Sequence, residues 1–420
     1  MNDVEKLVKL LTSTDSETQK EAARDLAEIA SGPASAIKAI VDAGGVEVLV
    51  KLLTSTDSEV QKEAARALAN IASGPDEAIK AIVDAGGVEV LVKLLTSTDS
   101  EVQKEAARAL ANIASGPDEA IKAIVDAGGV EVLVKLLTST DSEVQKEAAR
   151  ALANIASGPD EAIKAIVDAG GVEVLVKLLT STDSEVQKEA ARALANIASG
   201  PTSAIKAIVD AGGVEVLVKL LTSTDSEVQK EAARALANIA SGPDEAIKAI
   251  VDAGGVEVLV KLLTSTDSEV QKEAARALAN IASGPDEAIK AIVDAGGVEV
   301  LVKLLTSTDS EVQKEAARAL ANIASGPDEA IKAIVDAGGV EVLVKLLTST
   351  DSEVQKEAAR ALANIASGPT SAIKAIVDAG GVEVLQKLLT STDSEVQKEA
   401  QRALENIKSG GWLEHHHHHH

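Results

Sequence analysis

The sequence predicts an all-α fold, a solenoid built from stacked three-helix units. Three observations support this prediction. A block of 42 residues recurs along the 420-residue chain, glycine and proline divide each block into three segments, and the apolar residues of these segments follow helical spacing. Because no segment is long enough to be a stable helix alone in water, each block must bury its apolar surface on the blocks beside it.

The repeated block reads GGVEVLVKLLTSTDSEVQKEAARALANIASGPDEAIKAIVDA. An altered copy begins at Asn2, and the other copies begin at Gly44, Gly86, Gly128, Gly170, Gly212, Gly254, Gly296, Gly338 and Gly380, the last one truncated. We therefore predict one solenoid domain over residues 2–411. It comprises an N-terminal cap unit with two helices at 2–31, eight near-identical repeats at 32–367 and a C-terminal cap repeat at 368–411.

The first helix of each unit is the short segment DEAIKAIVDA, at 76–85 in the second repeat. Gly74-Pro75 precedes it. We expect Gly74 in the left-handed conformation that ends a helix, and Pro75 as the first residue of the next helix. Asp76 and Glu77 complement the positive end of the helix dipole, and this role is favoured over that of an acid/base pair.

The second helix is VEVLVKLL, at 88–95, and Gly86-Gly87 separates it from the first. This glycine pair lacks the preceding strand of a dinucleotide-binding loop and is interpreted as a turn. Within the helix, Glu89 and Lys93 have the spacing and order of a favourable ion pair.

The third and longest helix is SEVQKEAARALANIAS. The residues TSTDSE before and at its start predict a capping box, in which Thr98 caps the amide of Glu101 and Glu101 reaches back. Its apolar stripe has helical spacing and consists, in the earlier copy, of Val60, Ala64, Leu68 and Ile71.

The two ends of the chain differ from the repeat at two separate sets of positions. At the N-terminus Val48, Val60, Ala67 and Asn70 are replaced by Lys6, Thr18, Asp25 and Glu28. At the C-terminus Val50, Ala65, Ala69 and Ala72 are replaced by Gln386, Gln401, Glu405 and Lys408. We infer that the first set faces the preceding unit and the second set faces the following unit, and that polar caps keep the chain monomeric.

Composition argues against an enzyme. The chain has no Cys, and its six histidines are His415–His420, a purification tag that follows Leu413-Glu414, residues that suit a cloning site. The abundant Ser and Thr therefore have no histidine base, and no metal-ligand cluster or cofactor is expected. Phe and Tyr are absent, and Trp412 is interpreted as an absorbance label.

Charge and hydropathy exclude further classes of partner. The net charge of −25 opposes nucleic-acid binding and is interpreted mainly as helix capping and solubility. The longest apolar runs fall far below the roughly 18–20 residues of a membrane span. We expect a soluble recombinant protein with no targeting signal and no required partner.

The stretches IVDAGGVEVLVKLL and EAARALANIASG, in this order and spacing, resemble the armadillo repeat over residues 2–409. HEAT repeats are the alternative, but their units usually have two helices. Natural armadillo units differ in sequence, so near-identical units with tailored ends resemble an engineered or designed member. The resemblance implies a right-handed superhelix whose third helices line a concave groove.

The resemblance also implies a ladder of asparagines that could hold the main chain of an extended peptide. These residues are Asn70, Asn112, Asn154, Asn196, Asn238, Asn280, Asn322, Asn364 and Asn406. Natural peptide-binding members commonly have Trp four residues earlier, where this chain has Arg66, Arg108, Arg150, Arg192, Arg234, Arg276, Arg318, Arg360 and Arg402. The favoured interpretation is a scaffold, a potential binding module, on which Glu63, Arg66 and Asn70 form a solvated polar stripe with self-paired charges, retained without a ligand. The alternative is a groove that binds an extended peptide through the asparagine ladder.

Three short helices begin differently from the rest. Ala34-Ser35, Thr202-Ser203 and Thr370-Ser371 replace the usual Asp-Glu pair, at intervals of four units. These dipeptides suit restriction-site junctions, so we predict that blocks of four units were ligated between two end pieces.

Overall fold

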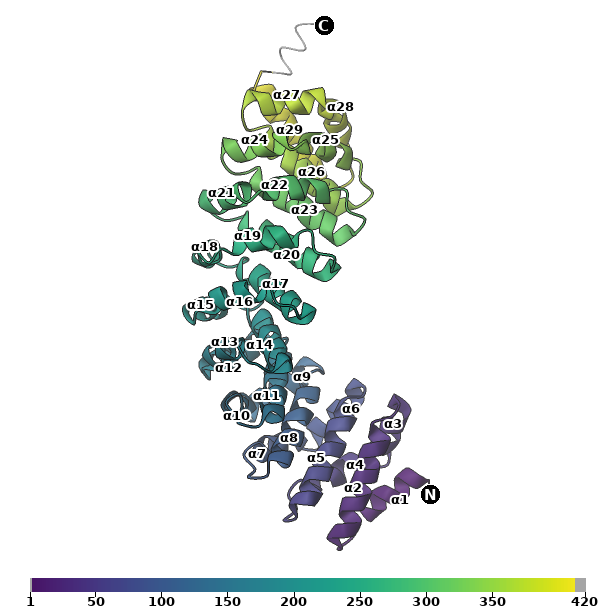
Figure 1. Ribbon diagram of the computed structural model, residues 1–420. Coiled ribbons are helices and arrows are strands. Elements are labelled where there is room, and N and C mark those ends of the chain that lie inside the picture. Colours follow the sequence, from purple (N-terminus) through teal and green to yellow (C-terminus); the bar gives the residue numbers. More distant parts are fainter. Residues whose placement is uncertain (1, 412–420) are drawn as a thin grey trace. The chain divides into compact units, whose positions relative to one another are not determined.

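The computed structural model describes residues 2–411, and these residues form 29 helices and no strand (Figure 1). Residues up to Gly213 belong to one compact unit and residues from Val214 onward to a second. Trp412, Leu413-Glu414 and the histidine tag lie outside the described residues. The organisation as one domain over residues 2–411 stays a prediction.

The first unit begins with a pair of helices and continues with helices in threes. Their bounds are α1 (Asp3–Leu10), α2 (Ser16–Ala30), α3 (Ala34–Asp42), α4 (Gly45–Leu52), α5 (Ser58–Ala72), α6 (Asp76–Asp84), α7 (Gly87–Leu94), α8 (Ser100–Ile113), α9 (Asp118–Asp126), α10 (Gly129–Leu136), α11 (Ser142–Ile155), α12 (Asp160–Asp168), α13 (Gly171–Leu178), α14 (Ser184–Ile197) and α15 (Thr202–Asp210).

The second unit repeats the pattern from α16, which begins at its boundary. The bounds are α16 (Gly213–Leu220), α17 (Ser226–Ile239), α18 (Asp244–Asp252), α19 (Gly255–Leu262), α20 (Ser268–Ile281), α21 (Asp286–Asp294), α22 (Gly297–Leu304), α23 (Ser310–Ile323), α24 (Asp328–Asp336), α25 (Gly339–Leu346), α26 (Ser352–Ile365), α27 (Thr370–Asp378), α28 (Gly381–Leu388) and α29 (Ser394–Ser409). The predicted order of short, second and longest helix is therefore confirmed.

The third helices form the centre of each stack. In the first unit α2, α5, α8, α11 and α14 pack on one another in sequence, and in the second unit α17, α20, α23, α26 and α29 do the same. Second helices pack on the third helix of their own repeat, as α7 does on α8 and α19 does on α20. Docking of each repeat on its immediate neighbours, the arrangement expected of a solenoid, is thus present within each unit.

The core is aliphatic, as the sequence predicts. Val60, Leu68 and Ile71 of α5 have no exposed surface, and the alanines between them are equally buried. Small alanine side chains let neighbouring third helices approach closely, while the branched residues fill the space between them.

The positions that change at the ends do face neighbouring repeats. The side chain of Asn70, on α5, donates a hydrogen bond to the carbonyl of Ala27 in the preceding repeat. A Cβ added to Gly87, in the following repeat, would lie 3.2 Å from Cγ2 of Val50. Ala65 and Ala69 are fully buried, whereas their C-terminal replacements, Gln401 and Glu405, are exposed, as are Lys6, Asp25 and Glu28 at the other end. The replacement residues are thus exposed, as expected of polar ends, while the bounds of the two cap units stay a prediction.

The junction at Gly74-Pro75 differs from prediction. Among the described glycines, those with positive φ are Gly411 and the first of each Gly-Gly pair, such as Gly86 at 76°, and Gly74 is not one of them. Gly74 is needed for space instead, because an added Cβ would lie 2.8 Å from Cδ1 of Ile37. Pro75 caps the helix one position before its first residue, and its carbonyl accepts from the amide of Ala78 at 2.9 Å.

The predicted capping box is wrong by one position. The N-cap of α8 is Asp99, whose Oδ1 accepts from the amides of Glu101 at 2.9 Å and Val102 at 3.4 Å. Asp99 in turn donates its own amide hydrogen to Oγ of Ser97 at 3.1 Å. Because α8 begins at Ser100, Asp99 directly precedes the helix and its carboxylate reaches these amides, so Thr98 has no capping role.

The ion pair predicted between Glu89 and Lys93 is absent, and the structure describes both residues. The lysines that do pair lie on the other two helices of the repeat, for example Lys80 with Asp84 at 2.7 Å and Lys104 with Glu101 at 2.9 Å.

No helix in the described part of the chain, residues 2–411, combines the length and apolar character required to cross a bilayer.

Candidate functional site

Each third helix presents five polar residues on one side. In α8 these are Glu101, Lys104, Glu105, Arg108 and Asn112. Each of them lies three or four residues from another member of the set, so they share one broad helical face. We call the surface formed by these residues and their equivalents in other repeats the third-helix face. It contains all the asparagines and arginines that the sequence singled out.

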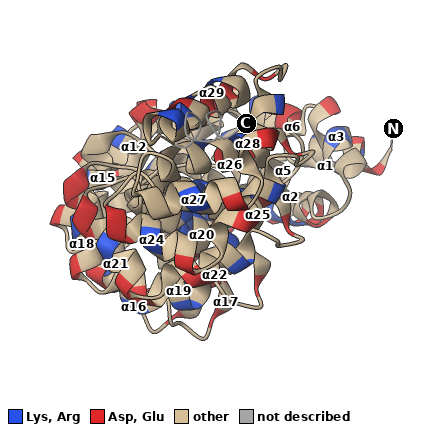
Figure 2. Ribbon diagram, turned by 90° about the horizontal axis from the view of Figure 1, so that it is seen from above, with Lys and Arg blue, Asp and Glu red and all other residues tan. Residues whose placement is uncertain are grey.

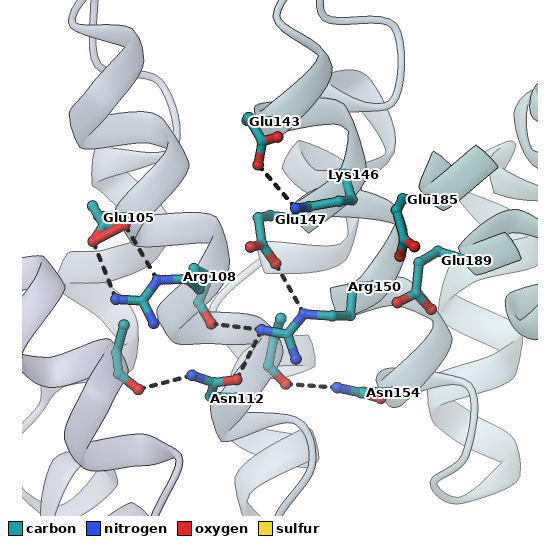
Figure 3. A network of polar contacts seen from close by, with 12 residues as sticks. Glu105, Arg108, Asn112, Glu143, Lys146, Glu147, Arg150, Asn154, Glu185 and Glu189 are labelled. Carbon is teal, nitrogen blue, oxygen red and sulfur yellow. Dashed lines mark hydrogen bonds and ion pairs between the residues drawn. The ribbon is translucent and has the colours of Figure 1, made fainter. Parts of the chain in front are cut away.

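A shallow groove of about 480 Å³ crosses this face in the first unit. Its lining is charged and comes from α5, α8 and α11, namely Lys62, Glu63, Arg66, Glu101, Lys104, Glu105, Arg108, Glu143 and Glu147. The groove is therefore polar, and the row of asparagines runs beside the arginine row (Figure 3).

The glutamate three residues before each arginine is buried and paired. Glu147 is 7% exposed, and its Oε1 accepts from Nε of Arg150 at 2.9 Å. The same pair recurs for Arg108, Arg192, Arg234, Arg276, Arg318, Arg360 and Arg402, and Arg66 lies 3.6 Å from Glu63. Burial of a carboxylate is costly unless it is compensated, so the arginine row is needed to hold the glutamate row.

A second set of pairs runs along the same face. Nζ of Lys146 lies 2.9 Å from Oε2 of Glu143, and the two side chains are 28% and 56% exposed (Figure 3). The hydrogen bond to Glu143 raises the pKa of Lys146, and the negative charges of Glu147 and Glu185 raise it further. Positive and negative charges on the third-helix face are therefore balanced within the protein.

The asparagine donates to the preceding repeat. Nδ2 of Asn112 lies 2.8 Å from the carbonyl oxygen of Ala69. Ala69 is among the last four residues of α5, whose carbonyls have no amide partner within the helix, so Asn112 caps one of them. The same bond joins Asn70, Asn154, Asn196, Asn280, Asn322, Asn364 and Asn406 to Ala27, Ala111, Ala153, Ala237, Ala279, Ala321 and Ala363.

The carboxamide oxygen accepts from the following repeat. Nη2 of Arg150 donates to Oδ1 of Asn112 at 2.8 Å and lies 3.5 Å from the carbonyl of Arg108 (Figure 3). The asparagine bond recurs between Arg192 and Asn154 and between Arg360 and Asn322. Each such asparagine therefore connects three consecutive repeats.

The structure thus brings the predicted arginines and asparagines together, with contacts that the sequence did not reveal. The self-paired charges of the Glu63, Arg66 and Asn70 stripe are present. The sequence analysis missed the bonds between repeats. The signal that could have pointed to them is the single Asn among the apolar residues of ARALANIASGP. Peptide binding by these residues stays a prediction.

A glutamine in each third helix was also missed. Nε2 of Gln103 donates to the carbonyl of Leu95 at 3.0 Å and caps the end of the second helix, α7. Within residues 2–411, no buried side-chain nitrogen or oxygen lacks a hydrogen-bond partner, and no group of acidic side chains could hold a metal ion.

Two family models match the chain. The Plant U-box protein ARM repeat region matches residues 3–278, and the Armadillo/beta-catenin-like repeat matches residues 285–325, 327–367 and 370–407. No curated protein matches the chain.

Solved structures give the same assignment. An engineered protein is 98% identical over 58% of this chain and 98% of its own, with a TM-score of 0.57. A designed armadillo repeat protein in complex with the peptide (KR)4 is 46% identical over 56% of this chain and 99% of its own, with a TM-score of 0.55. A second, computationally designed for modular peptide recognition, is 42% identical over 56% of this chain and 99% of its own, with a TM-score of 0.54. The chain belongs to the armadillo repeat family, among its engineered members.

Proposed function

We propose that this protein is a non-catalytic scaffold whose third-helix face binds extended peptides. The observation that carries the proposal is the row of carboxamides held in one orientation by the carbonyl of the preceding repeat and, at Asn112, Asn154 and Asn322, also by the arginine of the following repeat. One designed relative is described in complex with a peptide and another as designed for peptide recognition, which supports a peptide as the class of ligand.

The asparagine has capacity left for a peptide. A carboxamide offers two N–H donors and two acceptor lone pairs. In Asn112 one donor is bonded to Ala69 and one lone pair to Arg150, which leaves one of each for the N–H and C=O of a ligand. Arg150 and Ala69 also fix the orientation of the carboxamide, so it would lose little freedom on binding.

The spacing suits about two peptide residues per repeat. Two extended residues span about 7 Å, and packed helices lie roughly 8–10 Å apart. Because the charges of this face are already paired, we expect it to favour peptides of mixed charge, whose side chains can exchange with the existing pairs.

The experiment is a titration of fluorescein-labelled extended peptides, basic and mixed in charge, followed by anisotropy at low salt. Saturable binding of mixed-charge peptides that weakens at least tenfold when Asn112 and Asn154 are both replaced by Ala supports the proposal. Replacement of the exposed Ser115 and Ser157 by Ala is the matched control, because these neutral residues lie outside the third-helix face, and circular dichroism checks that both variants are folded. Absence of saturable binding, or equal binding by both variants, contradicts the proposal and leaves a scaffold without a ligand.

A further inference from the structure

In the part of the chain that the structure describes, each typical repeat has two acidic residues without an ion pair at the start of its short helix, away from the third-helix face, and a further one on its second helix, the equivalent of Glu89. Each typical short helix has three acids and one lysine, as Asp76, Glu77, Lys80 and Asp84 in α6. In the second unit α18 and α21 carry the same acidic residues at their exposed beginnings (Figure 2). Each typical short helix therefore has a net negative charge of its own.

Consecutive short helices form a groove between them. Between α6 and α9 the groove measures about 560 Å³, and its apolar lining is Ile79, Val83, Pro117 and Ala120. The equivalent groove between α21 and α24 measures about 370 Å³ and has the same register. The feature therefore occurs in both units.

Carboxylates surround this apolar floor. Lys80 is paired with Asp84 at 2.7 Å, so the one lysine of this helix is already engaged by one of its three acids. Asp76, Glu77 and Glu119 also line the groove and form no ion pair within the described part of the chain. An apolar floor with unpaired negative charge complements a side chain that has an aliphatic stem and a cationic end.

We propose that these grooves bind the lysine and arginine side chains of extended basic peptides. The aliphatic stem would lie on Ile79 and Val83 while the cation meets Glu77 and Glu119. One groove alone would bind weakly because its charges are exposed to solvent. Recurrence of the groove along the stack raises the effective concentration for each further side chain, and the net charge speeds association.

The chain contains its own comparison for this site. Where Ala34-Ser35 replace the acidic pair, the groove keeps Val41, Pro75 and Ala78 but has only Asp42 and Glu77 as acids, with Lys38 bonded to Asp42. The same exchange occurs at the start of α15 and α27, so the fold tolerates loss of these acids. The proposal is independent of peptide binding by the third-helix face, since it uses different residues.

The probe is a fluorescein-labelled octapeptide of alternating lysine and arginine, titrated by anisotropy at about 50 mM and 500 mM salt. The test variant replaces six groove glutamates by Gln, at Glu77, Glu119, Glu161, Glu245, Glu287 and Glu329. The matched control removes the same charge from the second helices, by Gln at Glu89, Glu131, Glu173, Glu257, Glu299 and Glu341.

We expect the test variant to lose at least tenfold in affinity at low salt and the control to lose less than threefold. In methyl NMR of the full chain, the probe should shift the Ile79 and Val83 signals and their equivalents. Equal loss in both variants would reduce the effect to net charge, and unchanged binding by the test variant, or loss caused by Asn112→Ala, would move the basic peptide to the third-helix face. Each of these results overturns the proposal.

Discussion

Asn112 donates a hydrogen bond to the carbonyl of Ala69, which lies 43 residues earlier in the sequence and one repeat away in the stack. The interface between repeats is therefore held by a directed polar contact as well as by aliphatic packing. Replacement of Asn112 by Ala leaves this carbonyl without its partner and removes the shorter of the two hydrogen bonds of Arg150 Nη2. We expect a loss of about 1–3 kcal/mol in local stability.

Hydrogen exchange of the α5 and α8 amides measures this loss without assuming that the whole chain unfolds in one step. Ser115→Ala, which removes a bond within one helix end, is the control and should have a smaller effect. Unchanged exchange in the Asn112 variant would show that the bond does not stabilise the interface.

The two glycines of each Gly-Gly pair should respond differently to alanine. A Cβ on Gly87 would lie 2.8 Å from Cγ2 of Ile82 and 3.0 Å from its carbonyl oxygen, so backbone must move. A Cβ on Gly86 meets nothing within 4 Å, and only its left-handed φ of 76° opposes the change, at about 1–2 kcal/mol. Urea titration of both variants should rank Gly87→Ala as the more destabilising, and the reverse order would contradict the crowded contact.

The corrected helix cap gives a matched pair in adjacent residues. Asp99→Ala removes the acceptor for two amides of α8 and should cost about 0.5–2 kcal/mol, whereas Thr98→Ala should cost much less. Exchange rates of the Glu101 and Val102 amides report the loss directly. A larger effect from Thr98→Ala would restore the capping box that the sequence suggested.

Alkaline pH should weaken the fold through its lysines. Hydrogen bonds to Glu101 and Asp84 raise the pKa of Lys104 and Lys80, respectively, above the ordinary value. Because the pKa is higher in the folded state, this stabilisation is complete below the unfolded value of about 10.4 and is lost as pH rises through the folded value. Urea midpoints measured from pH 8 to pH 11 should fall above about pH 10.4, and less so in a Lys80→Gln and Lys104→Gln variant.

Polar caps should keep the protein monomeric. Asp25 and Glu405 are exposed at positions where inner repeats have buried alanine. Static light scattering is expected to give a mass near 42.9 kDa. A variant with Asp25→Ala, Gln401→Ala and Glu405→Ala should associate end to end, and a dimer of the unaltered chain would show that the caps do not prevent association.

Helical spacing and punctuation predicted the helices, the aliphatic core and the faces used by the end positions. The predictions failed where the outcome depends on contacts between repeats or on the reach of one side chain. At Gly74 a larger residue would collide with Ile37 of the preceding repeat, and the local pattern of glycine and proline does not reveal this contact. The cap of α8 is Asp99 and not Thr98. Asp and Thr are both common cap residues, so the sequence did not distinguish two adjacent candidates. The partners of Asn112 lie 38 and 43 residues away, so only the register between repeats identifies them.

The near-identity of the repeats also bears on how the chain would respond to mechanical force. Within each unit every boundary between complete repeats has the same asparagine bond and the same alanine packing, so no inner repeat is favoured to detach first. A repeat of 42 residues has an extended length of about 140 Å. Pulled from its ends, the chain should lengthen in near-equal steps of this size and shorten by the same steps when the load is released.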